Sequence, residues 1–283
     1  MHRSISTTTT PRPQPGSGIL HPFPTTELAH VDPFVFLDTG EPRHLGPETI
    51  YVPPHPHRGV TPVSLLFRGR ITHRDSLGNH ATVGSGGMQW LVAGTGALHE
   101  ELLGGDDDGW FHMAQLWVNV PSHAKHHSPD HRALRADEIP VVDAGDGSTL
   151  RIYAGAFGAA VGPAPTVTPM LVGLATIDAG GSLTLPAPPE WTAAVTVVDG
   201  VATTSATKLA PGGTAVFAHD GDEIELESTD GAEVLVMVGE PIGEPVVVGG
   251  GFVMTNEADI ATAFADHARG AMGTLEPQLA GAR

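Results

Sequence analysis

The chain contains no cysteine, and it is poor in basic and aromatic residues. Without cysteine there can be no disulfides, iron–sulfur clusters, thiolate zinc sites or cysteine nucleophiles, so histidine, carboxylate or carbonyl groups would have to hold any metal. Only 14 Lys and Arg stand against 32 Asp and Glu, and the net charge of −18 disfavours direct contact with nucleic acids or anionic membranes. The 16 histidines are therefore the first candidates for chemistry.

Long hydrophobic runs are also missing. No window approaches the roughly 18 consecutive apolar residues of a membrane-spanning helix. Residues 1–18 are rich in Ser, Thr and Pro and lack the apolar core of about 7–15 residues that a secretory signal needs. We predict that this segment is a disordered tail and that the protein is cytoplasmic.

Glycine and proline are abundant, with 36 and 25 copies, which is typical of short strands joined by tight turns rather than of a helical bundle. Short apolar runs between Val60 and Trp117, separated by turn signals, predict an antiparallel β-barrel or sandwich. The same rhythm returns in the second half, where residues 197–202 resemble residues 66–71. The expected fold is all-β, with a barrel over residues 19–145 and another over residues 146–283 that ends in a short helix.

Two pairs of polar residues are spaced i, i+2: His55 with His57, and His99 with Glu101. Alternate residues of a strand share one face, so four ligands converge if the two segments are neighbours in the barrel. Three imidazoles and one carboxylate suit Fe(II), Mn, Ni or Cu, and octahedral geometry would leave two positions for water, O2 or substrate. One such pair is expected by chance among 16 histidines, whereas two pairs in phase predict a metal site.

The motifs around these residues resemble the pirin family, whose members are two-domain proteins of the cupin superfamily (bicupins). The resemblance spans about residues 30–270, and it implies that His55, His57, His99 and Glu101 match the family's metal ligands in the N-terminal cupin. The metal is usually iron, and Ni, Mn, Cu and Zn stay open. Glu100 is expected to face away from the site. The matching segments are His55–Gly59, His73–Asn79, Gln89–Trp90, Ala93–Gly94, His99–Glu101, Gln115–Asn119, Gly239–Pro245 and Phe252–Met254.

Some positions depart from the family pattern. Val60 and Thr61 stand where pirins have Phe and Glu, and Gly87 replaces a common Asp. None of these positions is a metal ligand in the family. They therefore affect the shape of the pocket and the choice of substrate rather than metal binding.

The resemblance implies a mononuclear non-haem iron protein with quercetin (flavonol) 2,3-dioxygenase activity, acting on a small flavonol-like molecule and O2. Glu101 would be the catalytic residue, as a ligand or as the base that accepts the flavonol hydroxyl proton. The alternative is a metal-dependent, redox-sensing regulatory protein that binds a protein partner and has no catalysis of its own. In either case we expect a monomer with no direct contact to nucleic acid or membrane.

The C-terminal cupin is predicted to hold no metal. Carrying the four ligands across the repeat places Pro186, Pro188, Leu226 and Ser228 at the equivalent positions, and none of them can replace an imidazole or a carboxylate. His219 is the single histidine between Thr166 and Gly250. The nearby Glu223, Glu225 and Glu227 are expected to lie on a solvated strand face.

Other polar and aromatic residues have a structural interpretation as well as a functional one. Arg58 could orient a ligand or form an ordinary ion pair. We expect structural polar groups at His73, Asp75 and His80, and core positions for Trp90 and Trp117. The histidines His123, His126, His127 and His131 predict a solvated polar loop, with a surface metal site or a pocket lid as the alternative.

Overall fold

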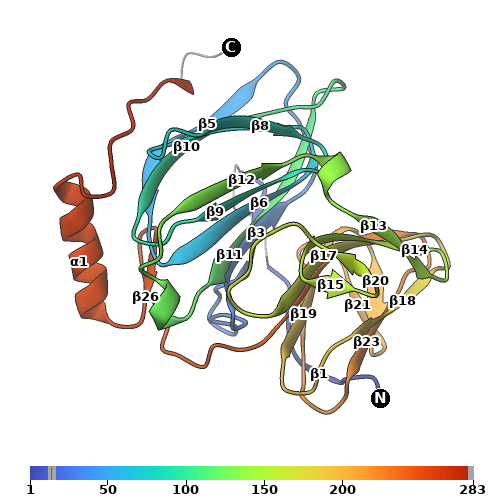
Figure 1. Ribbon diagram of the computed structural model, residues 1–283. Coiled ribbons are helices and arrows are strands. Elements are labelled where there is room, and N and C mark those ends of the chain that lie inside the picture. Colours follow the sequence, from blue (N-terminus) through green and yellow to red (C-terminus); the bar gives the residue numbers. More distant parts are fainter. Residues whose placement is uncertain (12–13, 15–16, 280–283) are drawn as a thin grey trace. The chain divides into compact units, whose positions relative to one another are not determined.

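The computed structural model describes residues 1–11, 14 and 17–279 (Figure 1). Apart from one α-helix and two short 3-10 turns, its regular elements are β-strands, and every pairing between the strands detailed below is antiparallel. The all-β prediction is confirmed. The chain divides into two compact units, each built from two segments: residues 42–136 with 243–283, and residues 1–41 with 137–242. We call them the N-terminal cupin and the C-terminal cupin. No helix among the described residues is both long and apolar enough to cross a membrane.

The N-terminal cupin contains two larger antiparallel sheets and the two-stranded pair β25-β26. One has the strand order β5-β10-β7-β8, and the other runs β12-β9-β6-β11 with β4 on the edge of β11. A cluster of buried apolar side chains that includes Leu66, Ile71 and Phe111 forms part of its core. The strands are β4 (Arg43–His44), β5 (Thr49–His57), β6 (Val60–Arg68), β7 (Arg70–Asp75), β8 (His80–Gly84), β9 (Met88–Val92), β10 (Ala97–Gly104), β11 (Trp110–Asn119), β12 (Asp130–Leu134), β25 (Val247–Gly249) and β26 (Phe252–Met254).

The predicted C-terminal helix is present as α1 (Glu257–Ala268), and it belongs to the N-terminal cupin. The side chain of Asn256 accepts a hydrogen bond of 2.9 Å from the backbone N–H of Asp259, which satisfies a free donor of the first turn. Arg58 lies just after β5 and donates to Asp266 on the helix at 2.7 Å. Arg58 thus has the structural role, because its ion pair ties α1 to the β5–β6 turn.

The C-terminal cupin also contains two antiparallel sheets, ordered β1-β22-β19-β24-β17-β14-β13 and β18-β23-β20-β21; β2 pairs with β3, and β15 pairs with β16. Its interior is filled by aliphatic side chains, many of them from β19 and β24. The strands are β1 (Ile5–Thr9), β2 (Ile19–Phe23), β3 (Phe34–Gly40), β13 (Val141–Gly145), β14 (Ser148–Ala154), β15 (Ala156–Phe157), β16 (Ala160–Val161), β17 (Met170–Ile177), β18 (Ser182–Pro186), β19 (Thr192–Gly200), β20 (Ala202–Thr204), β21 (Thr207–Leu209), β22 (Thr214–Phe217), β23 (Glu223–Glu227) and β24 (Ala232–Gly239).

The N-terminal segment differs from the disordered tail that its composition predicts. Residues Ile5–Thr9 form β1, which pairs with β22. The Thr run favours a strand because β-branched side chains pack well on a pleated sheet. The guanidinium of Arg3 is buried and donates to the backbone carbonyl of Trp191 at 2.8 Å. Residues 12, 13, 15 and 16 of the predicted tail lie outside the described residues.

The domain boundaries also differ from the predicted ranges 19–145 and 146–283. The division falls between residues 136 and 137, and the two terminal segments are exchanged. Residues 1–41 group with the C-terminal cupin, and residues 243–283 group with the N-terminal cupin. Repeat periodicity reports where one barrel follows another along the chain, but it carries no information about which barrel a terminal segment pairs with.

Candidate metal centre

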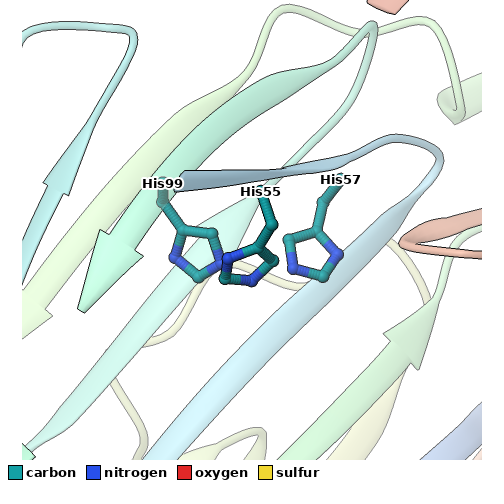
Figure 2. A group of neighbouring side chains, drawn as sticks. All are labelled: His55, His57 and His99. Atoms are coloured by element: carbon teal, nitrogen blue, oxygen red, sulfur yellow. The ribbon is translucent and has the colours of Figure 1, made fainter. Parts of the chain in front are cut away.

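Three of the four predicted ligands lie together in the N-terminal cupin (Figure 2). His55 and His57 project from the same face of β5, two residues apart, and β10 places His99 directly opposite His55. The ring centroid of His55 is 4.2 Å from that of His99, and the His57 and His99 centroids are 5.0 Å apart. One ligand atom from each ring lies within 4.8 Å of the others, which is close enough to share one metal ion.

Hydrogen bonds fix the orientation of these imidazoles. Nδ1 of His55 donates to the carbonyl of Pro53 at 2.9 Å, and Nδ1 of His57 donates to the carbonyl of Gly251 at 3.0 Å. Because a carbonyl only accepts, each ring carries its proton on Nδ1 and keeps the Nε2 lone pair for a metal. Nε2 of His99 is buried and has no hydrogen-bond partner among the described residues. Such an orphaned nitrogen, beside two other free Nε2 atoms, fits a metal ion.

Gly251 is a part of this centre that motif analysis does not reveal. A Cβ atom at this position would lie 2.0 Å from the carbonyl oxygen of Pro56 and 3.1 Å from Nδ1 of His57. Only glycine therefore lets the backbone come close enough for its carbonyl to hold the His57 ring. The sequence signal is a run of three glycines at residues 249–251, which has no distinguishing spacing.

Burial keeps two of the imidazoles neutral. Desolvation, with a smaller contribution from the nearby His55, lowers the pKa of His57 to about 3. Desolvation and the neighbouring histidines likewise hold the pKa of His99 well below its usual value. A metal ligand must be unprotonated, so these two rings are ready to coordinate at neutral pH without first losing a proton.

Glu101 lies near the three imidazoles but not among them. Its carboxylate is within 4.8 Å of ligand atoms of His99 and His73, and Oε1 accepts a hydrogen bond of 3.2 Å from Ser64. Glu101 is thus close to His99, but it does not belong to the group of three ligand atoms on His55, His57 and His99 that all lie within 4.8 Å of one another. Its carboxylate would have to turn from Ser64 to complete a four-ligand set.

Glu100 points to the opposite face of β10, as expected. Its side chain is buried and forms an ion pair with Arg74. It also accepts hydrogen bonds from the Tyr51 hydroxyl at 2.7 Å and the Gln278 backbone N–H at 3.1 Å. These contacts anchor the segment after α1 and leave the carboxylate no role at the metal centre.

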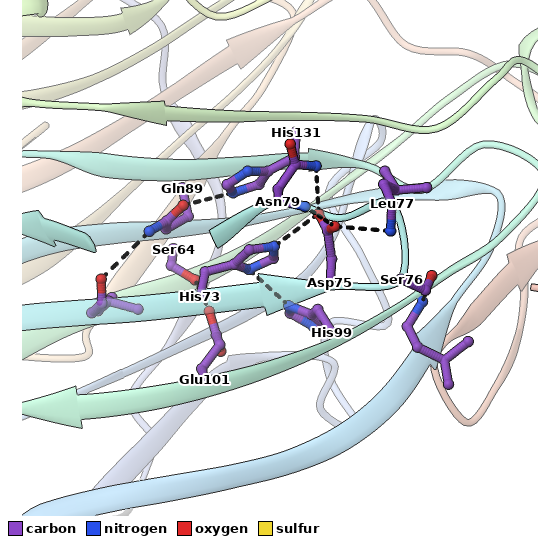
Figure 3. Close-up of polar contacts among 12 residues, drawn as sticks. Ser64, His73, Asp75, Ser76, Leu77, Asn79, Gln89, His99, Glu101 and His131 are labelled. Atoms are coloured by element: carbon purple, nitrogen blue, oxygen red, sulfur yellow. Dashed lines mark hydrogen bonds and ion pairs between the residues drawn. The ribbon is translucent and has the colours of Figure 1, made fainter. Parts of the chain in front are cut away.

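A second group of polar side chains adjoins the first (Figure 3). His73 and Asp75 on β7 are almost fully buried, and Nε2 of His73 lies 3.1 Å from Oδ2 of Asp75. The His131 ring stacks on that of His73, with centroids 3.9 Å apart and an angle of 3° between the planes. Nε2 of His131 lies 2.6 Å from Oε1 of Gln89.

His131 differs from the three histidines that precede it in the sequence. His123, His126 and His127 are exposed, as a solvated loop predicts, whereas His131 belongs to β12 and is partly buried. The sequence feature that indicates this difference is the strand-like alternation of residues 130–134, because His131 and Ala133 then lie on the same face of a strand.

The two tryptophans differ in environment. Trp90 is 1% exposed and lies in the core, as predicted. Trp117 is only partly buried, and its ring packs edge-to-face against His57 with centroids 5.1 Å apart. Trp117 therefore forms part of the wall of the candidate metal centre.

The free energy of unfolding of the metal-free protein is expected to fall as the pH is lowered. Burial lowers the pKa of His131 to about 4 and that of His57 to about 3, from 6.5 in an ordinary environment. Below about pH 6.5 the histidines of the unfolded chain bind protons, whereas His131 and His57 of the folded chain stay neutral until their own lower pKa values are reached. The free energy of unfolding therefore declines from about pH 6.5 towards pH 4. Urea unfolding across this range should show a shallower pH dependence for His131→Asn. The exposed His126→Asn should match the parent, and equal slopes in all three proteins would contradict this assignment.

The fold and this site define a bicupin with a histidine cluster in its N-terminal cupin. The Pirin family model matches residues 16–118, and the model of the Pirin C-terminal cupin domain matches residues 174–273. The chain belongs to the pirin family.

Curated relatives and a solved structure agree with this assignment. The chain is 34% identical to a pirin-like protein of Caulobacter vibrioides, over 87% of this chain and 89% of that protein. It is 32% identical to human pirin, over 85% of this chain and 82% of that protein. A crystal structure of quercetin 2,3-dioxygenase from Acinetobacter baumannii superposes with a TM-score of 0.91 and 32% identity, covering 98% of this chain and all of that one.

Proposed function

We propose that this protein binds one metal ion through His55, His57, His99 and Glu101. Three imidazoles and one carboxylate form a mixed nitrogen and oxygen set that suits Fe(II), with Ni, Mn, Cu and Zn as alternatives. The observation that carries the proposal is the free Nε2 of His99, buried beside two rings whose Nδ1 atoms are already used. The aliphatic interior of the C-terminal cupin supports the proposal that this unit holds no metal.

The C-terminal residues singled out by sequence are consistent with that proposal. Leu226 is fully buried among apolar side chains, and Ser228 donates to the carbonyl of Val201 at 2.8 Å. His219 is exposed. Along β23 the glutamates alternate with the buried Ile224 and Leu226, so they lie on the more exposed face of the strand.

We further propose that the protein is a flavonol 2,3-dioxygenase of the quercetinase type. The structural likeness to a quercetin 2,3-dioxygenase at 32% identity supports this activity. A bound iron would supply a Lewis acid for the flavonol hydroxyl and the redox chemistry with O2. In the balanced reaction both atoms of O2 enter the product, the heterocyclic ring opens and carbon monoxide leaves.

The chain's own residues would accept the substrate's proton and form the surface against which the substrate binds. In the alternative in which Glu101 stays outside the ligand set, it would accept the proton of the flavonol hydroxyl, and the Ser64 hydroxyl, 3.2 Å from Oε1, would orient the carboxylate. The pKa of a hydroxyl falls when it meets a Lewis acid, so a carboxylate is a sufficient base. The Trp117 ring beside His57 offers an apolar surface for an aromatic substrate.

Activity of the iron-loaded or nickel-loaded protein towards quercetin tests the proposal. We expect O2 consumption that depends on quercetin and is matched by carbon monoxide release in equal amount. The same protein treated with a chelator, and the loaded protein without quercetin, are the controls. Metal uptake without turnover for any divalent metal would contradict the oxygenase and favour the redox-sensing regulatory alternative, which uses the same ligands.

A further inference from the structure

The carboxylate of Asp75 is saturated with hydrogen-bond donors. Oδ1 accepts from the backbone N–H groups of Leu77 and Asn79, each at 2.9 Å. Oδ2 accepts from the Asn79 side-chain amide at 2.8 Å and faces Nε2 of His73 at 3.1 Å (Figure 3). Burial alone raises the pKa of Asp75, but the hydrogen bonds from His73 and Asn79 outweigh it and hold the pKa below its usual range. Asp75 is therefore a buried anion that only accepts.

This arrangement determines which nitrogen of His73 carries the proton. Since Asp75 can only accept, Nε2 of His73 must donate, and Nδ1 of a neutral His73 then has a free lone pair. That Nδ1 atom lies 3.4 Å from Nδ1 of His99. The pair can form a hydrogen bond only if His99 carries its proton on Nδ1, which leaves the lone pair of His99 on Nε2.

His99 differs in this respect from the other two imidazoles. Backbone carbonyls, which cannot change their character as acceptors, orient His55 and His57. The partner of His99 is instead a side chain that can either donate or accept, so its orientation depends on what lies beyond it. Asp75 supplies that missing constraint.

We propose that Asp75 and His73 form a hydrogen-bonded relay that holds His99 in its metal-binding tautomer, which makes both of them positioning residues for the metal. The relay runs from the Asp75 carboxylate through Nε2 and Nδ1 of His73 to Nδ1 of His99. It rests on the proposed metal centre and adds a buried carboxylate that acts through two rings.

A second metal ion on His73, Asp75 and His131 fits the contacts less well, although their ligand atoms lie within 4.8 Å of one another. The carboxylate already accepts from four donors. The rings of His73 and His131 are stacked nearly parallel, so their in-plane lone pairs run side by side instead of converging on one point. The groups around Asp75 donate hydrogen bonds to its carboxylate and do not surround a position that a cation could occupy.

Asp75→Asn tests the relay with little change in shape. Its amide oxygen can still accept from the two backbone N–H groups of the turn, but its amide nitrogen now donates towards Nε2 of His73. His73 must then carry its proton on Nδ1, opposite the Nδ1 proton of His99, and His99 is driven to protonate its metal-binding nitrogen. We expect metal affinity to fall about 10- to 100-fold, the usual effect of losing a partner that orients a metal-bound histidine.

Asp106→Asn is the matched control. Oδ1 of Asp106 accepts from the backbone N–H groups of Asp108 at 3.1 Å and Trp110 at 2.9 Å, in the same i+2 and i+4 pattern as Asp75. Its Oδ2 pairs with Arg68 instead of a histidine. This variant should keep the parent's metal affinity even if its metal-free form is slightly less stable.

Two substitutions at His73 that have the same number of side-chain heavy atoms separate positioning from packing. The side-chain oxygen of His73→Asn can accept from Nδ1 of His99 in place of the imidazole nitrogen, whereas His73→Leu offers no acceptor. We expect the Asn variant to retain most of the metal affinity and the Leu variant to lose it. A general loss of packing would affect both alike.

Competition between each protein and a chromophoric chelator for Co(II) gives the affinity, and the visible absorption of bound Co(II) reports the ligand field. Thermal unfolding of the metal-free proteins checks their folding. The relay predicts weaker binding and an altered spectrum for Asp75→Asn and His73→Leu only. If the parent binds Co(II) and Asp75→Asn binds it as tightly as Asp106→Asn, the relay is wrong and the metal centre stands. If the parent binds no metal, both the relay and the metal centre are wrong. If the parent binds two equivalents of Co(II) and Asp75→Asn binds only one, then Asp75 belongs to a second metal site and the relay is wrong.

Discussion

Metal content is expected to fall by orders of magnitude in His57→Ala, the largest effect of any single change proposed for this protein. The substitution removes one coordinate bond, and the water that fills the gap is a weaker donor than imidazole. It also leaves the Gly251 carbonyl without its Nδ1 partner. Because His57 is 3% exposed, the vacated space lies inside the protein and cannot be filled by a flexible surface side chain.

Metal analysis after loading and gel filtration measures this effect. The parent should retain one ion per chain, because the C-terminal cupin offers an aliphatic interior. His126→Ala is the matched control, since His126 is an exposed histidine of the same N-terminal cupin. This variant should leave the metal content unchanged. Full occupancy in His57→Ala would remove His57 from the ligand set.

Turnover of quercetin is expected to fall about 10²- to 10⁴-fold in Glu101→Gln, the range that a general base contributes. The amide keeps the size of the carboxylate, and its oxygen can still accept from the Ser64 hydroxyl. It carries no negative charge and cannot take up the proton of the flavonol hydroxyl. The fold should therefore survive while kcat falls.

Glu100→Gln provides the comparison for this experiment. Glu100 is the adjacent carboxylate and is also buried, but it faces Arg74 and Tyr51 on the other side of β10. Glu100→Gln should mainly lower the melting temperature, whereas Glu101→Gln should mainly lower kcat. Steady-state O2 consumption and thermal unfolding of both metal-loaded variants give the two readouts. Undiminished turnover in Glu101→Gln would exclude Glu101 as the base.

The sequence by itself determined the all-β class, the repetition of one barrel by another and the position of His55 and His57 on one strand face. These features follow from local rules. Alternation along a strand turns His55 and His57 to one face whatever surrounds them, and Gly and Pro signals mark the turns between successive strands. The cap at Asn256 is equally local, because donor and acceptor are three residues apart.

Only the tertiary structure decided the surroundings of those imidazoles. The carbonyl of Gly251 lies 194 residues beyond His57, and His131 reaches His73 from a different sheet, so no spacing rule relates them. The pairing of β1 with β22 and the exchange of the terminal segments arise in the same way. Strand patterns specify which face a side chain takes, whereas the identity of the neighbour on that face depends on long-range pairing that a single sequence does not encode locally.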